Sequence, residues 1–371
     1  MEAASLTAAL RGDPRMTILD PARLNAFMGQ VVGDLGATMS TALVLLGDKL
    51  GLYKAMAAAG VEGVTSAELA QRTATHERYV REWLLNQAAG GYVGFDARSG
   101  RYSIAAEQAA ALADETSPCH VPGGFYIAAS MIRDLPKIES AFKTGEGIDW
   151  GEHDTDLFCG TELFFAASYR ANLVGSWIPA LDGVTAKLER GVTVADIGCG
   201  HGASTIIMAL AFPRSEFIGI DAHGPSIECA QQAAANAGVA ARCRFETARA
   251  HEYTIPAGGF DFITFFDCLH DMGDPVGAAS HAKRALKPDG TVMVVEPAAG
   301  DRVVDNLNPV GRVFSAASTM ICVPASIKHR GPALGAVAGE ARMSAVLREG
   351  GFARVQKAAA TPFNMVLEAR L

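Results

Sequence analysis

A glycine-rich segment at residues 196–203, Asp-Ile-Gly-Cys-Gly-His-Gly-Ala, follows an apolar stretch and opens a predicted helix. Glycines in such a turn let the backbone approach a ligand closely, and the free N–H groups of a helix N-terminus favour an anionic group. Gly198, Gly200 and Ala203 also satisfy the dinucleotide pattern G-x-G-x-x-A. Asp196 adds a carboxylate that can bind an ammonium group, directly or through water. S-adenosylmethionine (SAM) has an ammonium group and NAD has none, so the segment favours SAM.

Asp221 ends the second predicted strand, where a carboxylate can accept hydrogen bonds from both hydroxyls of a ribose. SAM and NAD both contain this ribose, so Asp221 indicates a nucleoside ligand without choosing between the two. The alternative is a surface aspartate that caps the following helix.

His270 follows the fourth predicted strand, within Phe-Phe-Asp-Cys-Leu-His-Asp-Met. Ligands of doubly wound sheets bind beyond the carboxyl ends of the strands, and an imidazole that titrates near neutrality can remove a proton from a hydroxyl. Glu296 ends the fifth strand and can accept a hydrogen bond from one imidazole nitrogen, which leaves the other nitrogen free as a base. The alternatives are a structural histidine and a strand-end carboxylate in solvent.

The elements that must position these residues alternate between strands and helices from residue 191 onward. This alternation predicts an α/β fold with a Rossmann-like, doubly wound parallel sheet. Two closely spaced final strands must run antiparallel and form a C-terminal hairpin, which is uncommon among nicotinamide-binding folds. The predicted strands are residues 192–197, 216–221, 242–246, 260–266 and 291–296, with the hairpin at 352–358 and 363–369.

The chain before residue 186 is predicted to be mainly helical. Residues 24–59 have helical periodicity and form either a core helix or a dimerisation helix. Residues 62–115 indicate a winged helix, with Thr65 or Ser66 capping one helix and Thr75 the next. We therefore expect a helical and winged-helix dimerisation domain at residues 1–115, an aromatic-rich helical linker or substrate lid at 116–185 and the ligand-binding domain at 186–371.

Composition narrows the functional classes. The 371 residues carry a formal net charge of −8, and the winged-helix segment has more acidic than basic residues, which argues against nucleic-acid binding. The seven cysteines form no C-x-x-C pair and the nine histidines show no H-x-x-x-H spacing, so we expect no metal site and a reducing compartment. Glu2, Arg11 and Asp13 argue against a signal peptide, and the apolar run at residues 41–47 is too short to span a bilayer. We expect a cytoplasmic protein without membrane contact.

These residues resemble the class I SAM-dependent methyltransferases. The resemblance covers roughly residues 24–371 and is closest to plant and bacterial small-molecule O-methyltransferases with an N-terminal winged-helix dimerisation domain. It implies SAM as cofactor, a homodimer, His270 as the general base and Glu296 as its orienting partner. Met272 stands where that group has a tryptophan, and Ala248-Arg249 stands where many members bind adenine through an acid, so backbone atoms are expected to bind the adenine.

The resemblance and the residues together give a set of candidate site residues. Asp267 falls where such enzymes contact the methionine part of SAM, and Tyr169 falls where a helix contacts cofactor and substrate. The predicted cofactor-binding residues are Asp196, Gly198, Cys199, Gly200, Asp221, Ala222, Ala248, Arg249, Asp267 and Tyr169. The predicted contacts to a small-molecule methyl acceptor are Trp150, His153, Phe165, Asn308 and Met320.

Three functions are compatible with these sequence features. The first is a SAM-dependent methyltransferase that modifies a small-molecule hydroxyl, or a nitrogen or carbon that needs no base. The second is a winged-helix regulator with a SAM-binding domain, which a basic surface on the winged helix would favour. The third is an NAD-dependent oxidoreductase, against which the closing hairpin argues.

Overall fold

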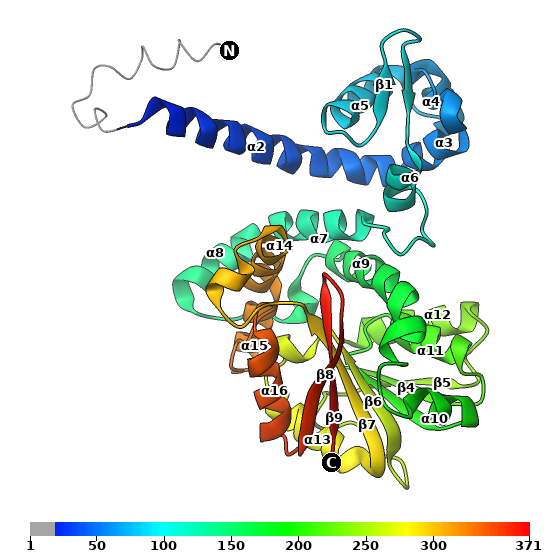
Figure 1. The fold of residues 1–371 in the computed structure, drawn as a ribbon, viewed down its shortest axis with the longest axis vertical. Coiled ribbons are helices and arrows are strands. Elements are labelled where there is room, and N and C mark those ends of the chain that lie inside the picture. The colour runs from blue at the N-terminus through cyan, green and yellow to red at the C-terminus, as the bar shows by residue number, and fades with distance from the viewer. Residues whose placement is uncertain (1–18) are drawn as a thin grey trace. The chain divides into compact units, whose positions relative to one another are not determined.

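The computed structural model describes residues 19–371, and the chain divides into two compact units, Met1–Asp114 and Glu115–Leu371. Glu2, Arg11 and Asp13, which argue against a signal peptide, lie outside the described residues. The aromatic-rich residues 116–185, expected as a linker or lid, belong to the same unit as the sheet. Figure 1 shows both units.

The first unit begins with the long helix α2, Pro21–Lys49. The Asp20 side chain caps it by accepting from the N–H groups of Ala22 and Arg23, and Pro21 occupies the first turn, where its missing N–H costs nothing. Gly51, with φ of 68°, then turns the chain, so the single predicted helix at 24–59 is two helices. The remaining helices of this unit are α3 (Leu52–Ala58), η2 (Gly60–Glu62), α4 (Ser66–Thr73), α5 (Glu77–Ala89) and α6 (Ala106–Leu112).

The winged helix forms at α4, α5 and two short strands, β1 (Gly94–Asp96) and β2 (Arg101–Ser103). Thr65, not Ser66, caps α4, and it forms a capping box with Glu68. His76 caps α5 in place of the predicted Thr75, because its ring nitrogen accepts from a backbone N–H of the first turn. The strands pair antiparallel and together make the wing.

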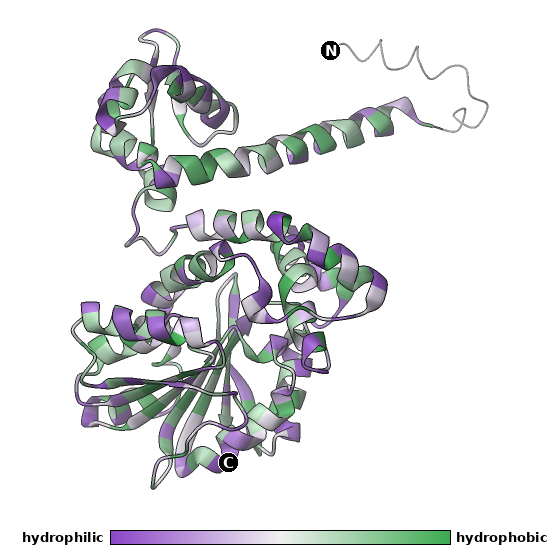
Figure 2. Cartoon of the chain, turned by 180° about the vertical axis from the view of Figure 1, so that it is seen from behind, coloured by the Kyte–Doolittle hydropathy of each residue, from purple (hydrophilic) through white to green (hydrophobic). Residues whose placement is uncertain are grey.

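Helix α2 is apolar along much of its length (Figure 2). By length and composition, α2 and the helical segment Pro309–Lys328 are the two described segments long and apolar enough to cross a membrane. The apolar run at residues 41–47 is only part of the apolar length of α2, because phenylalanine, methionine, valine, leucine and alanine also occur between Pro21 and Ser40. Core helices and signal sequences pass the same test, so this finding alone places no helix in a bilayer.

The second unit contains a seven-stranded sheet with the order β5-β4-β3-β6-β7-β9-β8. The strands from β5 to β7 pair parallel, and β9 pairs antiparallel with both β7 and β8. The Rossmann-like sheet and its antiparallel hairpin are therefore confirmed, although β7 begins earlier than predicted. The strands are β3 (Thr193–Ile197), β4 (Glu216–Asp221), β5 (Cys243–Thr247), β6 (Phe260–Phe266), β7 (Leu286–Pro297), β8 (Arg354–Ala360) and β9 (Asn364–Arg370).

Helices cover both faces of this sheet (Figure 1). Alternate residues of one strand enter opposite cores, as strand periodicity requires: Ala195 and Ile197 pack with α13 and α16, whereas Val194 packs with α10 and α11. The covering helices are α10 (Val184–Arg190), α11 (Ala203–Ala211), α12 (Gly224–Asn236), α13 (Pro275–Ala285) and α16 (Gly339–Glu349). The other segments are α7 (Pro122–Arg133), α8 (Leu135–Thr144), η3 (Trp150–Glu152), α9 (Asp156–Asn172), η4 (Leu173–Trp177), η5 (Leu269–Asp271), η6 (Val303–Asn306), α14 (Pro309–Ala317), η7 (Ser318–Cys322) and α15 (Val323–Lys328).

Two glycines let α7 and α9 pack backbone to backbone. A Cβ at Gly123 would lie 2.4 Å from the Phe164 nitrogen, and a Cβ at Gly160 would lie 2.8 Å from the Tyr126 Cβ and 2.9 Å from the Ile127 nitrogen. This contact fixes the position of α9, which carries Phe165 and Tyr169.

We predict that Gly160→Ala lowers the free energy of unfolding by about 1–3 kcal/mol, because the added methyl meets atoms that cannot rotate away. Gly175→Ala is the matched control, since the Cβ it adds meets nothing within 4 Å. Chemical denaturation of the full chain measures both. Equal free energies of unfolding for Gly160→Ala and Gly175→Ala would show that the close contact between α7 and α9 does not contribute to stability.

Candidate functional site

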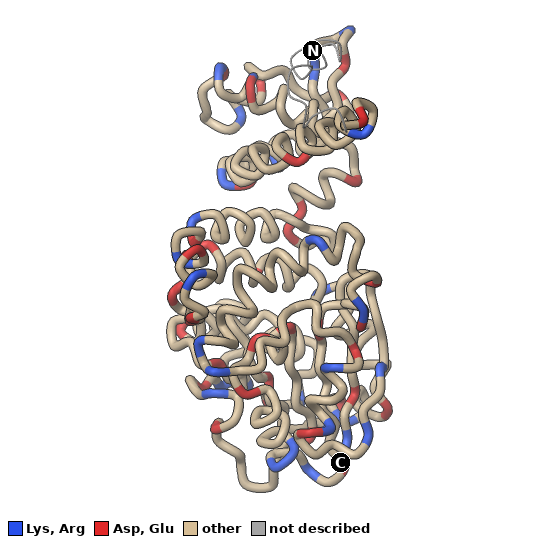
Figure 3. The backbone as a smooth tube through the Cα atoms, turned by 90° about the vertical axis from the view of Figure 1, so that its left-hand side faces the viewer, with Lys and Arg blue, Asp and Glu red and all other residues tan. Residues whose placement is uncertain are grey.

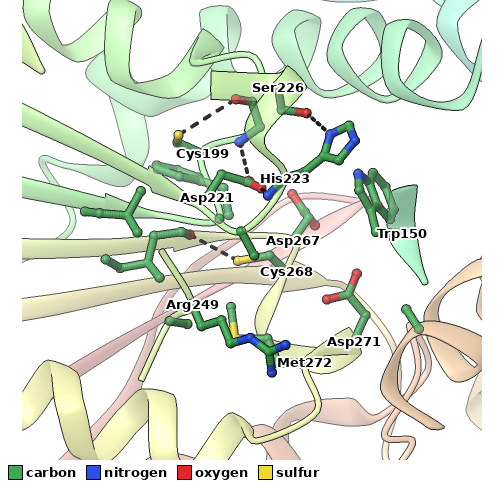
Figure 4. A pocket seen from close by; sticks show the side chains of 18 of the residues that line it. Trp150, Cys199, Asp221, His223, Ser226, Arg249, Asp267, Cys268, Asp271 and Met272 are labelled. Atoms are coloured by element: carbon green, nitrogen blue, oxygen red, sulfur yellow. Dashed lines mark hydrogen bonds between the residues drawn. The ribbon is translucent and has the colours of Figure 1, made fainter. Parts of the chain in front are cut away.

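A cavity of about 580 Å³ lies at the carboxyl ends of β3, β4, β5 and β6 (Figure 4). Its lining includes Ile197, Asp221, Thr247 and Phe266, the final residues of these four strands. The volume falls within the range of small-molecule and cofactor sites. The position is the one where doubly wound sheets bind their ligands.

The glycine segment forms the turn between β3 and α11. Gly198, Gly200 and Gly202 all have positive φ, at 71°, 51° and 81°. A Cβ at Gly198 would lie 2.6 Å from the Cys268 sulfur, and one at Gly202 would lie 3.1 Å from the Phe245 ring, whereas a Cβ at Gly200 would meet nothing. Gly198 and Gly202 therefore allow the turn to pack closely against its neighbours. Gly200 leaves the backbone open toward the cavity.

Asp221 lies beside this turn at the cavity mouth and holds it in place. Its Oδ2 accepts from the Gly200 N–H at 2.9 Å, and its Oδ1 accepts from the His223 N–H at 2.8 Å. Burial raises the pKa of the Asp221 carboxyl, and the two N–H donors oppose that rise. Each oxygen keeps a lone pair for a ligand hydroxyl. Cys199 and Ala222 line the cavity beside it.

Asp196 does not reach the cavity. Its side chain is buried, with Oδ2 accepting from Ser204 at 2.7 Å and Thr205 at 2.6 Å and Oδ1 accepting from Thr264 at 2.9 Å. Of the two expected modes, direct or through water, the direct contact with a ligand ammonium group is therefore wrong. Asp196 instead joins β3 to the start of α11 and to β6, and in this way it positions the glycine turn.

Asp267 follows β6 with the unusual φ of 51° and faces the cavity. The Tyr169 hydroxyl donates to its Oδ2 at 3.1 Å, and the Asn364 amide donates to its Oδ1 at 2.9 Å. Burial, reinforced by the nearby charge of Glu296, raises the pKa of Asp267 well above its usual range. Tyr169 and Asp267, far apart in sequence, thus meet in the cavity wall, whereas Asn364 from β9 carries no motif that would have revealed it.

Ala248 and Arg249 both line the cavity just after β5. The Ala248 N–H donates to the Asp221 carbonyl at 3.0 Å, so this backbone group is already engaged. The Arg249 side chain is more than half exposed and lies 4.0 Å from the Glu252 carboxylate. Neither position supplies a carboxylate that could accept a hydrogen bond from an adenine amino group.

His270 and Glu296 form a buried pair. The Glu296 Oε2 lies 2.5 Å from the His270 Nδ1, and its Oε1 accepts from the Leu269 N–H at 3.0 Å. The His270 Nε2 lies 3.3 Å from the Cys322 sulfur of η7, and His270 is absent from the cavity lining. The predicted mouth position is therefore wrong: the ring lies behind the wall, with both nitrogens contacted by protein.

The candidate acceptor contacts divide into two groups. Trp150 and Phe165 line the cavity. His153 is buried elsewhere with its Nδ1 2.8 Å from the Asp134 carboxylate, Asn308 is exposed and caps α14, and Met320 packs in a core cluster with Phe314 and Ile321. These last three expectations are wrong for this cavity, because residue type alone could not distinguish a lining side chain from a structural one.

Sequence reasoning also missed several cavity residues. His223 contacts the Ser226 hydroxyl at 2.8 Å and packs against Phe158 with ring centroids 4.9 Å apart. His329 lies 3.0 Å from the Asp149 carboxylate, and Asp271 lines the wall beside His270. None of these residues belongs to a motif that would have placed it at the site. Residues 19–371 contain no group of three or more His, Cys, Asp or Glu side chains that could hold a metal ion.

Comparison with known families identifies both parts of the chain. Residues 188–350 match the family described as a methyltransferase domain, and residues 38–114 match the Rv2258c-like winged HTH domain. The chain contains a winged-helix domain followed in the sequence by a methyltransferase domain. The resemblance inferred from the sequence is confirmed at this level, and most residues that line the cavity lie within the matched methyltransferase domain.

Relatives of known sequence or structure agree with this assignment. The chain is 32% identical over 131 residues to 27-O-demethylrifamycin SV methyltransferase of Amycolatopsis mediterranei, a match that covers 34% of this chain and 48% of that relative. It thus spans about half the length of this relative. Human N-acetylserotonin methyltransferase in complex with SAM shares the fold, with a TM-score of 0.67, 16% identity and coverage of 95% of this chain and 99% of the human chain. An O-methyltransferase family protein of Burkholderia thailandensis gives a TM-score of 0.65, 16% identity and coverage of 95% and 98%.

The His270–Glu296 pair of the methyltransferase domain gives a testable charge state. Burial alone would lower the pKa of His270, but the adjacent carboxylate of Glu296 raises that pKa well above its ordinary value. We predict that His270 stays protonated through neutral pH and that Glu296→Gln brings its pKa down to or below the ordinary value.

NMR titration of isotope-labelled histidine measures both values, with His270→Gln identifying the signal. A wild-type imidazole that loses its proton below the ordinary pKa of a histidine would show that Glu296 does not hold the charge.

Proposed function

We propose that the protein is a SAM-dependent methyltransferase that transfers a methyl group to a hydroxyl of a small molecule. The observation that carries this proposal is the Asp221–Gly200 contact at the cavity mouth within a methyltransferase domain. It supports a nucleoside ligand held between the ends of β3 and β4. The SAM and SAH complexes among the structural neighbours support the choice of nucleoside.

The residues of the cavity fit SAM. The open face of Gly200 admits a ligand against the backbone, and the free lone pairs of Asp221 suit a ribose diol. Asp267, fixed by Tyr169 and Asn364, faces the cavity where the methionine part would lie. SAM supplies a sulfonium-bound methyl group with an excellent leaving group, so positioning of the acceptor contributes much of the acceleration.

His270 is the proposed general base, oriented by Glu296. The hydrogen bond at Nδ1 leaves Nε2 as the nitrogen that receives the acceptor proton. In the resting arrangement Nε2 contacts Cys322, so the acceptor hydroxyl must displace this thiol to reach the base. Cys322 lies in a π-helical segment, and such segments are frequent at functional sites.

A screen of hydroxylated and amine metabolites with labelled SAM tests the proposed function. Once an acceptor is found, we predict that His270→Ala lowers kcat by about 10²- to 10⁴-fold with nearly unchanged SAM affinity. The cofactor residues lie on other elements, which is the reason for this separation. Because the substitution leaves Glu296 buried without its partner, His270→Gln provides a second variant with a neutral polar group.

The wild-type rate should rise with pH through the raised pKa of His270, because only the neutral imidazole accepts a proton. Near-normal turnover by His270→Ala and His270→Gln would show that His270 is not the general base. The reaction would then be methylation of an already nucleophilic nitrogen, carbon or sulfur.

We also propose that the protein forms a homodimer through α2. Its side chains Phe27, Val32, Leu35 and Met39 are each more than half exposed, a large apolar surface for one helix. We predict that light scattering gives a dimer and that Leu35→Glu with Met39→Glu gives a monomer. Val61→Glu, at a fully exposed apolar residue outside α2, is the control that stays dimeric. A monomeric wild-type protein would contradict the proposal.

The winged helix is proposed not to bind nucleic acid. Arg78 of α5 pairs with Glu82 and Arg81 with Glu77, so glutamates of the same helix neutralise these arginines. Figure 3 shows acidic and basic residues interspersed over this unit. Salt-sensitive binding of duplex DNA at micromolar protein would contradict this part of the proposal.

A further inference from the structure

The cavity wall beside His270 carries a carboxylate that no other side chain pairs with in the described part of the chain. Asp271 ends η5 and lines the cavity, and within residues 19–371 no hydrogen bond or ion pair joins its side chain to another side chain. Burial raises the pKa of Asp271 to about 7; Glu296 and Asp221 add to the rise, and His270 opposes it. The backbone N–H of Asp271 itself opposes this rise, and a cationic ligand group would stabilise the carboxylate further.

The other carboxylates that line the cavity all have partners. Asp149 pairs with His329 at 3.0 Å, Glu162 contacts His201 at 2.8 Å, and Asp274 accepts from the Gly277 N–H at 2.7 Å. Asp221 and Asp267 each accept two hydrogen bonds, as described above. Asp271 is thus the carboxylate that stays available to a ligand.

The side chains of the cavity carry little permanent positive charge. Among its described lining residues there is no lysine, and the one arginine, Arg249, lies beside Glu252 at the exposed rim. A ligand carboxylate near Asp271 would meet like charge in a partly desolvated wall, which disfavours binding.

Aromatic rings border the same space. Trp150 and Phe158 line the cavity with ring centroids 5.8 Å apart. In Figure 4 the Asp271 carboxylate points into the space that Trp150 also borders. Ring faces attract cations while they bury apolar groups, so this part of the cavity combines an apolar wall with one negative charge.

We propose that the methyl acceptor is an aromatic molecule with a protonated amine and that Asp271 binds this amine. The inference rests on the proposed function, because it names the acceptor class of the same cavity. Asp271 acts here as a residue that determines specificity, and His270 keeps the role of base.

The test uses the full-length protein saturated with S-adenosylhomocysteine and three probes of similar shape: phenethylamine, phenethyl alcohol and hydrocinnamate. Calorimetry should give the amine an affinity about tenfold or more above the alcohol, with hydrocinnamate weakest, because a hydrogen bond to a charged group is worth at least that factor. Amine affinity should rise as pH increases through about 7, where Asp271 becomes charged.

Two variants separate Asp271 from the general charge of the cavity. Asp271→Asn should abolish both the amine preference and its pH dependence. Asp274→Asn should keep the preference, because asparagine preserves the cap on α13 while it removes a neighbouring charge. Circular dichroism checks that both variants fold.

The outcomes separate the two proposals. Failure of S-adenosylhomocysteine itself to bind would overturn the proposed function and this inference with it. Binding of S-adenosylhomocysteine with equal affinity for amine and carboxylate, with no amine binding at millimolar concentration, or with a preference that survives Asp271→Asn would overturn the acceptor class alone.

Discussion

Three hydroxyls donate to the buried carboxylate of Asp196, and the rest of the site depends on this arrangement. Ser204 and Thr205 belong to α11 and Thr264 to β6, so one side chain fixes where the first strand of the sheet ends, where the next helix begins and how the central strand pairs. Burial raises the pKa of Asp196, and the three donors offset much of that cost. With the turn fixed, the Gly200 N–H can meet Asp221, and the cavity mouth takes its shape.

The sequence predicted the features that depend on local patterns. Strand patterns located all seven strands of the sheet, and they placed the glycine segment and Asp221 at the carboxyl ends of two strands, where the cavity lies. The pairing of His270 with Glu296 followed from their positions at two strand ends.

Whether a side chain lines the cavity or is buried behind its wall was not predictable in the same way. Asp196 and His270 lie behind the cavity wall because hydroxyls and a thiol from distant segments enclose them. His153, Asn308 and Met320 were misplaced because their partners lie in tertiary contacts that a single sequence does not display.

The two acidic neighbours of His270 illustrate how burial separates similar side chains. Glu296 is almost fully buried and gives one oxygen to the imidazole and the other to a backbone N–H, so its charge is compensated inside the protein. Asp271, adjacent in sequence to His270, faces the cavity, and no side chain of residues 19–371 forms a hydrogen bond or ion pair with it. One carboxylate therefore orients the proposed base, while the other remains for the ligand. This division of roles links the proposed chemistry to the proposed acceptor class, and it requires the same short segment, η5, to be held rigidly between β6 and α13.

The central claim is that the cavity between the glycine turn and Asp221 binds SAM. Titration calorimetry of the full chain with SAM and with NAD tests it most directly, together with the Asp221→Ala variant. The account predicts that wild-type protein binds SAM and that Asp221→Ala weakens this binding by roughly 10- to 150-fold, since hydrogen bonds to the charged carboxylate contribute about 1.5–3 kcal/mol. Tight binding of NAD with no binding of SAM would contradict it.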